Sequence, residues 1–465
     1  MDKTVIVVGA GIKGLYIARE LAELGFKVTL LERLNSTGGK IKTIRSPTCS
    51  HGAFAEMGAM RILESNTNVR KLLKDLSVPI IPFIGENENA PFCINNQVGR
   101  MKDLNLGVLI DAGLVENPIL KIDGVCQQMT FDQVLDIAFH DAEEFIRTKN
   151  NGKPMKVCEF LQVPGEGERV RKCAKVILDL RFGKTGHKND LLEFVQYHNY
   201  SSEQQYAVED GYDTVIYALT EDLHRRNVKI VLKSEVISVD YSKQGYVKVV
   251  CKKPGRDRTE TFLTHSVLFT SPCLHKIKFT PELPPIHQEM IHEKILKGCV
   301  PAMKSVLRFD DCFWQKNEHG GVIGGTCMFG PSLISKLLLP PFYCKEEGYI
   351  MIYLSGEPVH DWLTLSVEDR INVALEAIGK LFPSMKGGAR KHFKDMSEVV
   401  WNEPGSGAYI LYTPEEMGDA MQPVDRLVFS SVPRGWVEYA LLDGKVAIQQ
   451  IQKIFKQSQQ LHRRN

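Results

Sequence analysis

The sequence lacks the cysteine and histidine spacings that bind structural metals. Its 11 cysteines run from Cys49 to Cys344 without a CxxC pair, and no Cys/His cluster has metal-ligand spacing. This pattern argues against a zinc site and against a small scaffold held together by disulfides. We therefore expect no bound metal and a reducing, intracellular compartment.

The sequence also lacks a large net charge and long apolar runs. The formal net charge is +2, so no overall field favours nucleic acid or an anionic membrane. No apolar run approaches the ~18 residues of a membrane span, and a first strand beginning near Thr4 leaves no room for a signal peptide. We expect a cytoplasmic protein without a membrane span. A length of 465 residues with 43% hydrophobic residues predicts two or three globular domains.

What is present begins with a βαβ pattern. The β-branched run Thr4–Val8 is followed by the glycines of a GxGxxG motif, a helical pattern and a second strand at 27–31, which ends before Glu32. The first glycine, Gly9, allows the tight turn, Gly11 lets a pyrophosphate approach the backbone, and Gly14 allows close helix–strand packing. Glu32 stands where a carboxylate accepts hydrogen bonds from ribose hydroxyls. The sequence therefore predicts a dinucleotide site.

The residues after Glu32 favour FAD over NAD. The run ERLNSTGGKIKT places a glycine pair, Gly38 and Gly39, before the cation Lys40. This pattern suits a second pass of the chain over the phosphates of a longer cofactor. Here the sequence resembles the flavin-containing amine oxidase superfamily, which includes L-amino-acid, polyamine and monoamine oxidases. The resemblance implies that Arg33, Gly39 and Lys40 also contact the FAD.

The segment HGAFAEMGAMRI is similar to the motif that crosses the flavin ring in this superfamily, in its amino-acid oxidase version. The resemblance implies that Gly58, Ala59 and Met60 lie against the isoalloxazine. Arg61 would then clamp a substrate carboxylate through two hydrogen bonds. The alternative is an arginine that contacts only flavin or a structural carboxylate.

Later segments extend the resemblance over most of the chain. In SEVIS, Val236 falls where backbone groups hold the adenine, and in PAMKSVLRF, Lys304 matches a lysine that holds a water over flavin N5. A surface lysine is the alternative for Lys304. Trp401 is either a core residue or a cofactor contact, and Tyr409 matches one aromatic wall of the substrate site.

The C-terminal stretch GWVEYALLDGKVA resembles the superfamily's last helix, which points its N-terminus at the flavin's pyrimidine end. The resemblance implies that Gly435, Trp436 and Val437 contact the cofactor and that Trp436 forms the second aromatic wall. The two ends of the chain would then build one site.

The sequence departs from the superfamily at several positions. Ser36 and Lys40 replace arginines, and the Ala-Gly-Glu that usually follows Phe429 is missing. Leu338 and Leu339 stand where amino-acid oxidases carry tyrosines that support the carboxylate clamp. The last cysteine, Cys344, precedes the position of the flavin-tethering cysteine in monoamine oxidases, so we expect noncovalent FAD.

These observations predict an α/β protein with a doubly wound, Rossmann-like FAD-binding domain (1–64, 206–275 and 396–465), a mixed-sheet substrate domain (65–102 and 276–395) and a helical insertion (103–205). The leading function is FAD-dependent oxidation of an amine or L-amino acid by molecular oxygen, with an L-amino acid as the first expectation for the substrate, giving an imine and hydrogen peroxide. The catalytic candidates are Lys304, Arg61, Tyr409 and Trp436. Polyamine or monoamine oxidation, a catalytically inactive scaffold and a nicotinamide-dependent dehydrogenase are the alternatives. A homodimer is compatible with the sequence.

Overall fold

The protein is described from a computed structural model. The structure describes residues 3–464 except 46–53, 116–127, 166, 183–189, 193, 196–202, 254–257, 317–320, 342–346, 386, 411, 413 and 433. Cys344, on which the expectation of noncovalent flavin depends, lies outside the described residues.

A parallel five-stranded sheet contains the predicted βαβ unit. Its strands lie in the order β10 (Lys229–Val231), β2 (Lys27–Leu31), β1 (Thr4–Val8), β14 (Ser266–Phe269) and β23 (Leu427–Phe429). All four strand pairs are parallel. Buried strands of this kind need cover on both faces, which explains their continuous apolar runs.

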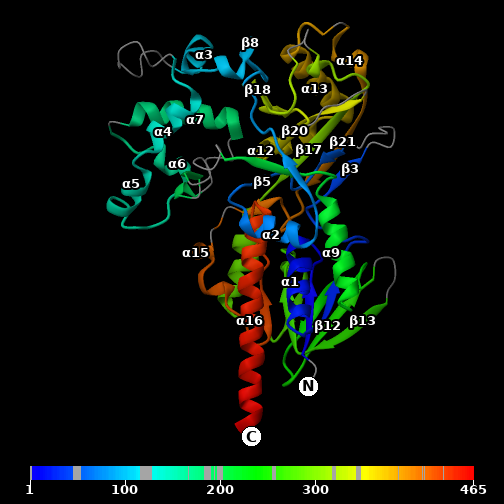
Figure 1. Cartoon of the computed structure of the whole chain (residues 1–465). Helices are drawn as coiled ribbons and strands as arrows, with labels where there is room; N and C mark the ends of the chain where they lie inside the picture. Colours follow the sequence, from blue (N-terminus) through cyan, green and yellow to red (C-terminus); the bar gives the residue numbers. More distant parts are fainter. Residues whose placement is uncertain are drawn as a thin grey trace.

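One face of this sheet is covered by helices from three distant parts of the chain. Helices α1 (Ile12–Glu23), α9 (Asp213–Arg225) and α16 (Val437–Arg464) share one hydrophobic core with β1 and β2, and α2 (Thr67–Asp75) joins them. Figure 1 shows α1 and α16 lying side by side, with the two chain ends near the same pole of the molecule. The first and last segments of the chain therefore fold as one unit.

The opposite face packs on a second sheet, which contains the strands β13 (Thr259–Thr264), β12 (Val247–Lys252), β11 (Glu235–Asp240) and β15 (Lys278–Thr280). Val236, Val239 and Phe269 belong to the core between the two layers. The predicted α/β class is confirmed, and the second layer here is a sheet where a doubly wound fold would have helices.

A mixed seven-stranded sheet forms the other half of the body. Its order is β21 (Phe393–Trp401), β17 (Ala302–Phe309), β20 (Gly348–Ser355), β19 (Lys336–Leu338), β18 (Thr326–Gly330), β7 (Pro91–Ile94) and β8 (Gln97–Arg100). Helices α12 (Glu357–Thr364), α13 (Val367–Leu381) and α14 (Gly388–His392) add to its core. The predicted boundary between residues 395 and 396 falls inside β21.

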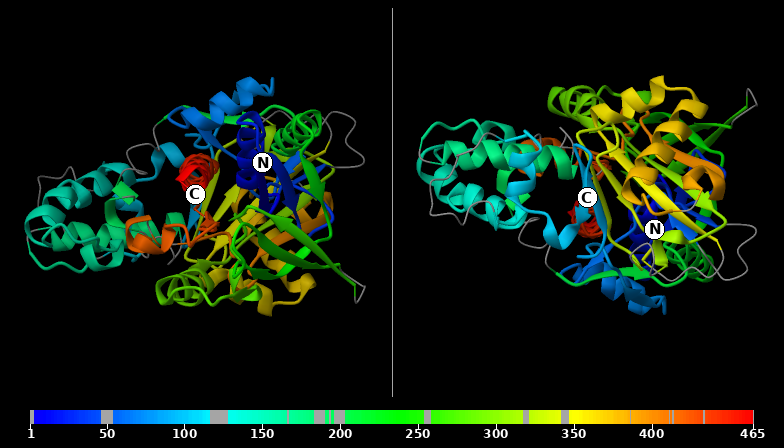
Figure 2. Two further views of the ribbon diagram at one scale, coloured as in Figure 1. Left: turned by 90° about the horizontal axis from the view of Figure 1, so that it is seen from below. Right: turned by 90° about the horizontal axis from the view of Figure 1, so that it is seen from above.

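The segment expected to be helical carries α3 (Leu106–Asp111), α4 (Phe131–Phe139), α5 (Ala142–Thr148), α6 (Val157–Phe160) and α7 (Glu168–Phe182). These helices share their own hydrophobic core, which also takes in Phe92 and Met328 from the seven-stranded sheet. In both views of Figure 2 they lie to one side of the sheets. Within the described residues, none of the helices combines the length and apolar character that crossing a bilayer requires.

Three small sheets join these parts around the site. They pair β3 (Thr43–Arg45) with β4 (Phe54–Glu56), β9 (Gln205–Val208) with β5 (Ile62–Leu63) and β6 (Ile80–Pro82), and β16 (Cys299–Val300) with β22 (Tyr409–Ile410). The second and third of these sheets link segments that are distant in the sequence, so residues near 58, 300 and 409 are brought to one region.

Candidate active site

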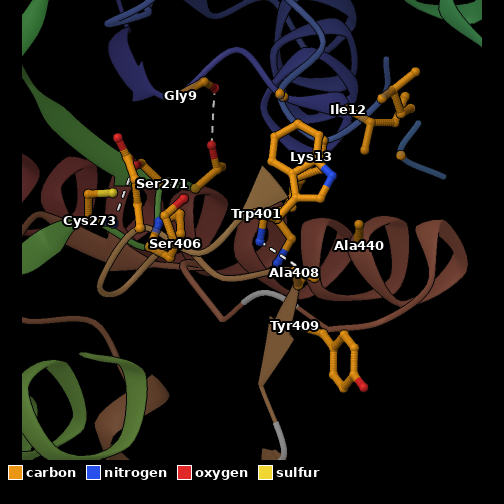
Figure 3. Close-up of a pocket in the computed structure, with 18 of the residues that line it drawn as sticks. Gly9, Ile12, Lys13, Ser271, Cys273, Trp401, Ser406, Ala408, Tyr409 and Ala440 are labelled. Carbon is orange, nitrogen blue, oxygen red and sulfur yellow. Dashed lines mark hydrogen bonds between the residues drawn. The ribbon is translucent and has the colours of Figure 1, made fainter. Parts of the chain in front are cut away.

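The glycine motif turns the chain sharply between β1 and α1. A Cβ atom placed on Gly14 would lie 1.9 Å from the Gly9 carbonyl oxygen, so only glycine allows the helix to pack this close to the turn. The Thr270 hydroxyl donates to the Gly9 carbonyl at 3.0 Å, a contact drawn in Figure 3. Gly9 and Gly11 both line a cavity of about 570 Å³, whereas Gly14 supports the turn from behind.

Glu32 closes one end of this cavity. Its carboxylate accepts hydrogen bonds from the backbone N–H groups of Ala10 and Leu34, each at 2.8 Å. Arg33 lies beside it at the cavity's exposed edge and pairs with Glu403 at 3.2 Å. Val236, at the start of β11, lines the same end.

The glycine doublet and the segment at 57–59 form the cavity's next wall. A Cβ atom on Gly58 would lie 1.8 Å from the Lys40 carbonyl oxygen, so the two segments can pack together only with glycine at this position. The Lys40 ammonium group donates to the carbonyl oxygens of Gly407 and Ala408. Burial lowers the pKa of Lys40 to about 8. Lys40 therefore ties the glycine doublet to the loop before β22.

Most of the predicted cofactor residues line this one cavity. They are Gly9, Gly11, Glu32, Arg33, Gly39, Lys40, Gly58, Ala59, Val236, Trp401, Gly435, Trp436 and Val437. In Figure 3 the glycine turn and Lys13 lie on one side of the cavity and Tyr409 on another, with Ala440 marking helix α16. The Trp401 indole donates to the Met57 carbonyl at 3.3 Å.

Met60 and Arg61, by contrast, line a second cavity, also of about 570 Å³. This cavity lies between the seven-stranded sheet and the helices α4 and α7, and it includes Leu338. The guanidinium carbon of Arg61 lies 5.9 Å from the centre of the Trp436 ring. Trp436 lines the first cavity and Tyr353 lines both, so Arg61 stands where the two cavities adjoin.

Lys304 is buried on β17 and faces the first cavity. Its ammonium group donates to the carbonyl oxygens of Glu56 at 2.7 Å and Gly58 at 2.8 Å. Burial lowers the pKa of Lys304 to about 7, although the nearby Glu56 carboxyl opposes the shift. Burial also raises the pKa of Glu56 to about 7, against the hydrogen bonds that its carboxylate accepts from Tyr212 and Thr43. The alternative interpretation of Lys304 as a surface lysine is therefore wrong.

Tyr409 and Trp436 come to the same cavity from β22 and from the residue before α16. Burial raises the pKa of the Tyr409 phenol, so this side chain stays neutral at physiological pH. An arginine at the junction, a lysine that titrates near neutrality and two aromatic side chains make a site suited to binding a small anion beside a long cofactor.

Comparison with known proteins agrees with this geometry. The sequence profile of the family described as flavin containing amine oxidoreductase matches residues 13–447. The chain belongs to this family. The L-amino-acid oxidase of Vipera ammodytes ammodytes is 24% identical over 477 residues, which cover 98% of this chain and 94% of that protein. The L-amino-acid oxidase of Bungarus fasciatus is 24% identical over 483 residues, covering 99% and 89%.

Solved structures of amine oxidases share the fold. Wild-type putrescine oxidase bound to putrescine superposes with a TM-score of 0.71 at 17% sequence identity, covering 97% of this chain and 99% of that one. Cyclohexylamine oxidase from Brevibacterium oxydans IH-35A gives a TM-score of 0.69 at 18% identity, covering 98% and 100%. Membership of the flavin-containing amine oxidoreductase family implies a flavin cofactor.

The first cavity fits such a group. Gly9, Gly11 and Gly39 leave its wall free of side chains beside the turn, and a Cβ atom on Gly39 would lie 3.0 Å from the Gly11 Cα atom. The Glu32 carboxylate lies at the same end.

The segment after β23, where the expected Ala-Gly-Glu is missing, is held by Lys13, a contact that the sequence did not reveal. After β23 the buried residues Ser430 and Ser431 follow directly, and the Lys13 ammonium group donates to the carbonyl oxygens of Ser430 at 2.9 Å and Val432 at 3.2 Å. Lys13 also pairs with Asp443 of α16 at 3.0 Å. The only hint of these contacts in the sequence is that Lys13 lies within the glycine motif. Its partners cannot be identified from local patterns, because they lie more than 400 residues away.

The other departures have different outcomes in the structure. Ser36 is exposed and does not line the cavity, so no hydroxyl replaces the family's arginine there. Leu338 faces the second cavity, whereas Leu339 is buried in the core behind the sheet. Sequence reasoning also missed Tyr353 and Lys336, which both line the second cavity.

Proposed function

We propose that the protein is a noncovalent FAD enzyme that oxidises L-amino acids. The observation that carries this proposal is the position of Arg61, on the second cavity and 5.9 Å from the ring of Trp436 on the first. A guanidinium there can hold the carboxylate of an amino acid through two parallel hydrogen bonds. The amine-bearing carbon then extends toward the first cavity.

When bound, the flavin supplies the acceptor for the hydride from the amine-bearing carbon, and oxygen takes up the two electrons as hydrogen peroxide. The amine nitrogen loses a proton as the imine forms. Water then replaces the nitrogen, so that one amino acid, one oxygen and one water give one 2-oxo acid, one ammonia and one hydrogen peroxide.

The protein's own residues orient the substrate and exclude water. Tyr409 and Trp436 present aromatic faces to the substrate nitrogen and favour its neutral form in a dry site. Lys304 uses two N–H groups on the carbonyl oxygens of Glu56 and Gly58. An ammonium group has three donors, and the third lies 3.9 Å from the weakly accepting Met60 sulfur, so a water in the first cavity can take the place of that contact.

Oxidation of a polyamine or monoamine is the second candidate. Leu338 gives the second cavity an apolar side chain at a place where amino-acid oxidases of the family are expected to carry a hydroxyl. An amine without a carboxylate would offer no group for Arg61 to bind.

The visible spectrum of the freshly purified protein, recorded before and after anaerobic addition of L-amino acids and then of amines, tests the proposal. Bleaching by amino acids supports it, and bleaching by amines alone favours the second candidate. A protein that stays colourless after addition of FAD would refute both and leave an inactive scaffold. In a bleaching enzyme, Arg61→Ala is expected to raise KM for amino acids at least about tenfold, as the loss of a charge-assisted hydrogen bond implies.

A further inference from the structure

The register of the seven-stranded sheet places three polar side chains in one row. Lys304 on β17 pairs with Tyr353 on β20. On the other side of β20, Leu337 pairs with Ile352, which sets Lys336 at the end of β19 beside Tyr353. Neighbours in such a row have Cβ atoms about 5 Å apart and lie on the same face of the sheet.

The two lysines flank the Tyr353 ring. The Lys304 nitrogen lies 5.4 Å and the Lys336 nitrogen 4.9 Å from the ring centre. Lys304 lines the first cavity, Lys336 lines the second and Tyr353 lines both. Lys336 therefore stands one side chain farther from the predicted flavin position than Lys304 does, on the side where the rest of a substrate held by Arg61 would lie.

Two cationic side chains, Arg61 and Lys336, line the second cavity close enough to influence each other. Burial, and then the positive charge of Arg61, lower the pKa of Lys336 to about 8. Asp132 and Arg181 in the wall pair with each other at 2.5 Å. The remaining charged residues of the lining are exposed at its outer part: Glu86, Glu88 and Lys102.

Two cations that repel each other in a half-buried cavity are stabilised by bound anions. If Arg61 takes the carboxylate next to the amine, a second carboxylate on the substrate side chain would meet Lys336. Leu338, two residues along the same strand face, would pack against the methylene groups between the two carboxylates.

We propose that Lys336 is a specificity-determining residue that binds a side-chain carboxylate, so that the preferred substrates are acidic L-amino acids with two carboxylates. This inference rests on the proposed amino-acid oxidase function. The same arrangement disfavours polyamines, because their distal ammonium groups would face Arg61 and Lys336.

The test compares kcat/KM for L-glutamate and L-glutamine, which differ in charge but hardly in shape. The wild type is expected to prefer glutamate at least about tenfold, as one charge-assisted contact implies. Lys336→Gln should remove this preference by lowering kcat/KM for glutamate alone, and Lys336→Arg should keep most of it. Lys336→Glu should favour L-lysine over L-glutamate. Lys102→Gln, which removes an exposed cation from the same cavity, should leave the ratio unchanged.

Three results would overturn the inference. The first is equal kcat/KM for glutamate and glutamine in the wild type. The second is an equal loss of kcat/KM for both substrates in Lys336→Gln. The third is a loss of the glutamate preference in Lys102→Gln as large as in Lys336→Gln. The second result would assign Lys336 to the carboxylate next to the amine, and the third would assign the preference to the overall charge of the cavity.

A binding measurement separates this inference from the proposed function. Glutarate, which has two carboxylates and no amine, should raise the unfolding temperature of the wild type more than that of Lys336→Gln, whereas butyrate, with one carboxylate, should shift both equally. If no amino acid is oxidised but the glutarate shift depends on Lys336, the oxidase proposal fails and the dicarboxylate site stands. If glutarate gives no Lys336-dependent shift, the dicarboxylate site fails even when amino acids are oxidised.

Discussion

Replacing Lys304 by methionine should leave the stability at pH 7 nearly unchanged and greatly lower the oxidase activity. The methionine keeps most of the side-chain volume but removes the charge and the hydrogen bonds to the carbonyl oxygens of Glu56 and Gly58. Leaving two buried carbonyls without this donor costs ~1–3 kcal/mol each. Against this, burial lowers the pKa of Lys304 from 10.5 to about 7, which corresponds to ~5 kcal/mol of disfavoured charge. The two effects nearly cancel, so the variant should fold with wild-type-like stability at pH 7.

The pH dependence of stability gives the sharper result. Because the pKa of Lys304 is about 7 when folded and 10.5 when unfolded, the unfolded chain binds more protons between these values, and this lysine's contribution to stability rises with pH. Linkage predicts that from pH 7 to pH 9 the wild type gains ~2 kcal/mol relative to Lys304→Met. Loss of the positive charge should also raise the pKa of Glu56 further, which makes the variant lose stability with pH and enlarges the difference.

Urea unfolding of both proteins without flavin, at pH 7, 8 and 9, measures this difference. Lys394→Met, which removes a partly exposed lysine paired with Asp310, is the matched control and should run parallel to the wild type. Oxidase activity of Lys304→Met should fall at least about 100-fold, in the range seen when one positioned hydrogen-bond donor is lost from an active site. Parallel stability profiles for the wild type and Lys304→Met would refute the assignment of a neutral-range pKa to this buried lysine.

Three further substitutions test the packing around the cavities. Gly58→Ala should weaken FAD binding at least about tenfold in a fluorescence titration, because its Cβ would meet the Lys40 carbonyl at 1.8 Å, whereas Gly379→Ala, with open space around it, should not. Lys13→Met should lower both FAD affinity and the unfolding free energy, the latter by ~3–5 kcal/mol, because the carbonyl oxygens of Ser430 and Val432 lose their donor and Asp443 keeps only Arg434, at 3.7 Å. Glu398→Leu should destabilise the protein by a similar ~3–5 kcal/mol in urea unfolding without changing the FAD dissociation constant, because Arg370 and Trp362 lose a shared acceptor far from the glycine turn.

The parts of the fold that the sequence predicted are those set by local patterns. The strands Thr4–Val8 and Lys27–Leu31 have the predicted bounds, because a β-branched run followed by a glycine turn specifies both the strand and its end. The apolar residues between Asn66 and Leu76 are spaced with a helical period, and the structure has a helix there from Thr67 to Asp75. The clustering of 13 predicted cofactor residues on one cavity depended on the family resemblance, since no local rule brings residues 58, 236 and 436 together.

The pairing register of distant strands has no local signal. The alternation of side chains within β17, β19 and β20 can indicate which residues share a face of each strand. It cannot indicate that Lys304, Tyr353 and Lys336 lie in one row, because that alignment is set when the sheet closes. Lys336 in ISKLLLPP was therefore hidden among apolar residues, and the residues of the second cavity that the sequence analysis singled out were Met60, Arg61 and Leu338.

The shortened connection after Phe429 bears on whether the site has decayed. Burying the Lys13–Asp443 pair costs desolvation free energy that its own attraction does not fully offset, and the carbonyl oxygens of Ser430 and Val432 complete the hydrogen bonding of the ammonium group. A chain under no constraint to keep this wall in place would be more stable with apolar residues at both positions. The pair fixes the start of α16 against the glycine turn, so Gly435, Trp436 and Val437 still line the cavity without the family's glutamate. A buried ion pair that keeps this wall of the cavity in place argues against an abandoned site.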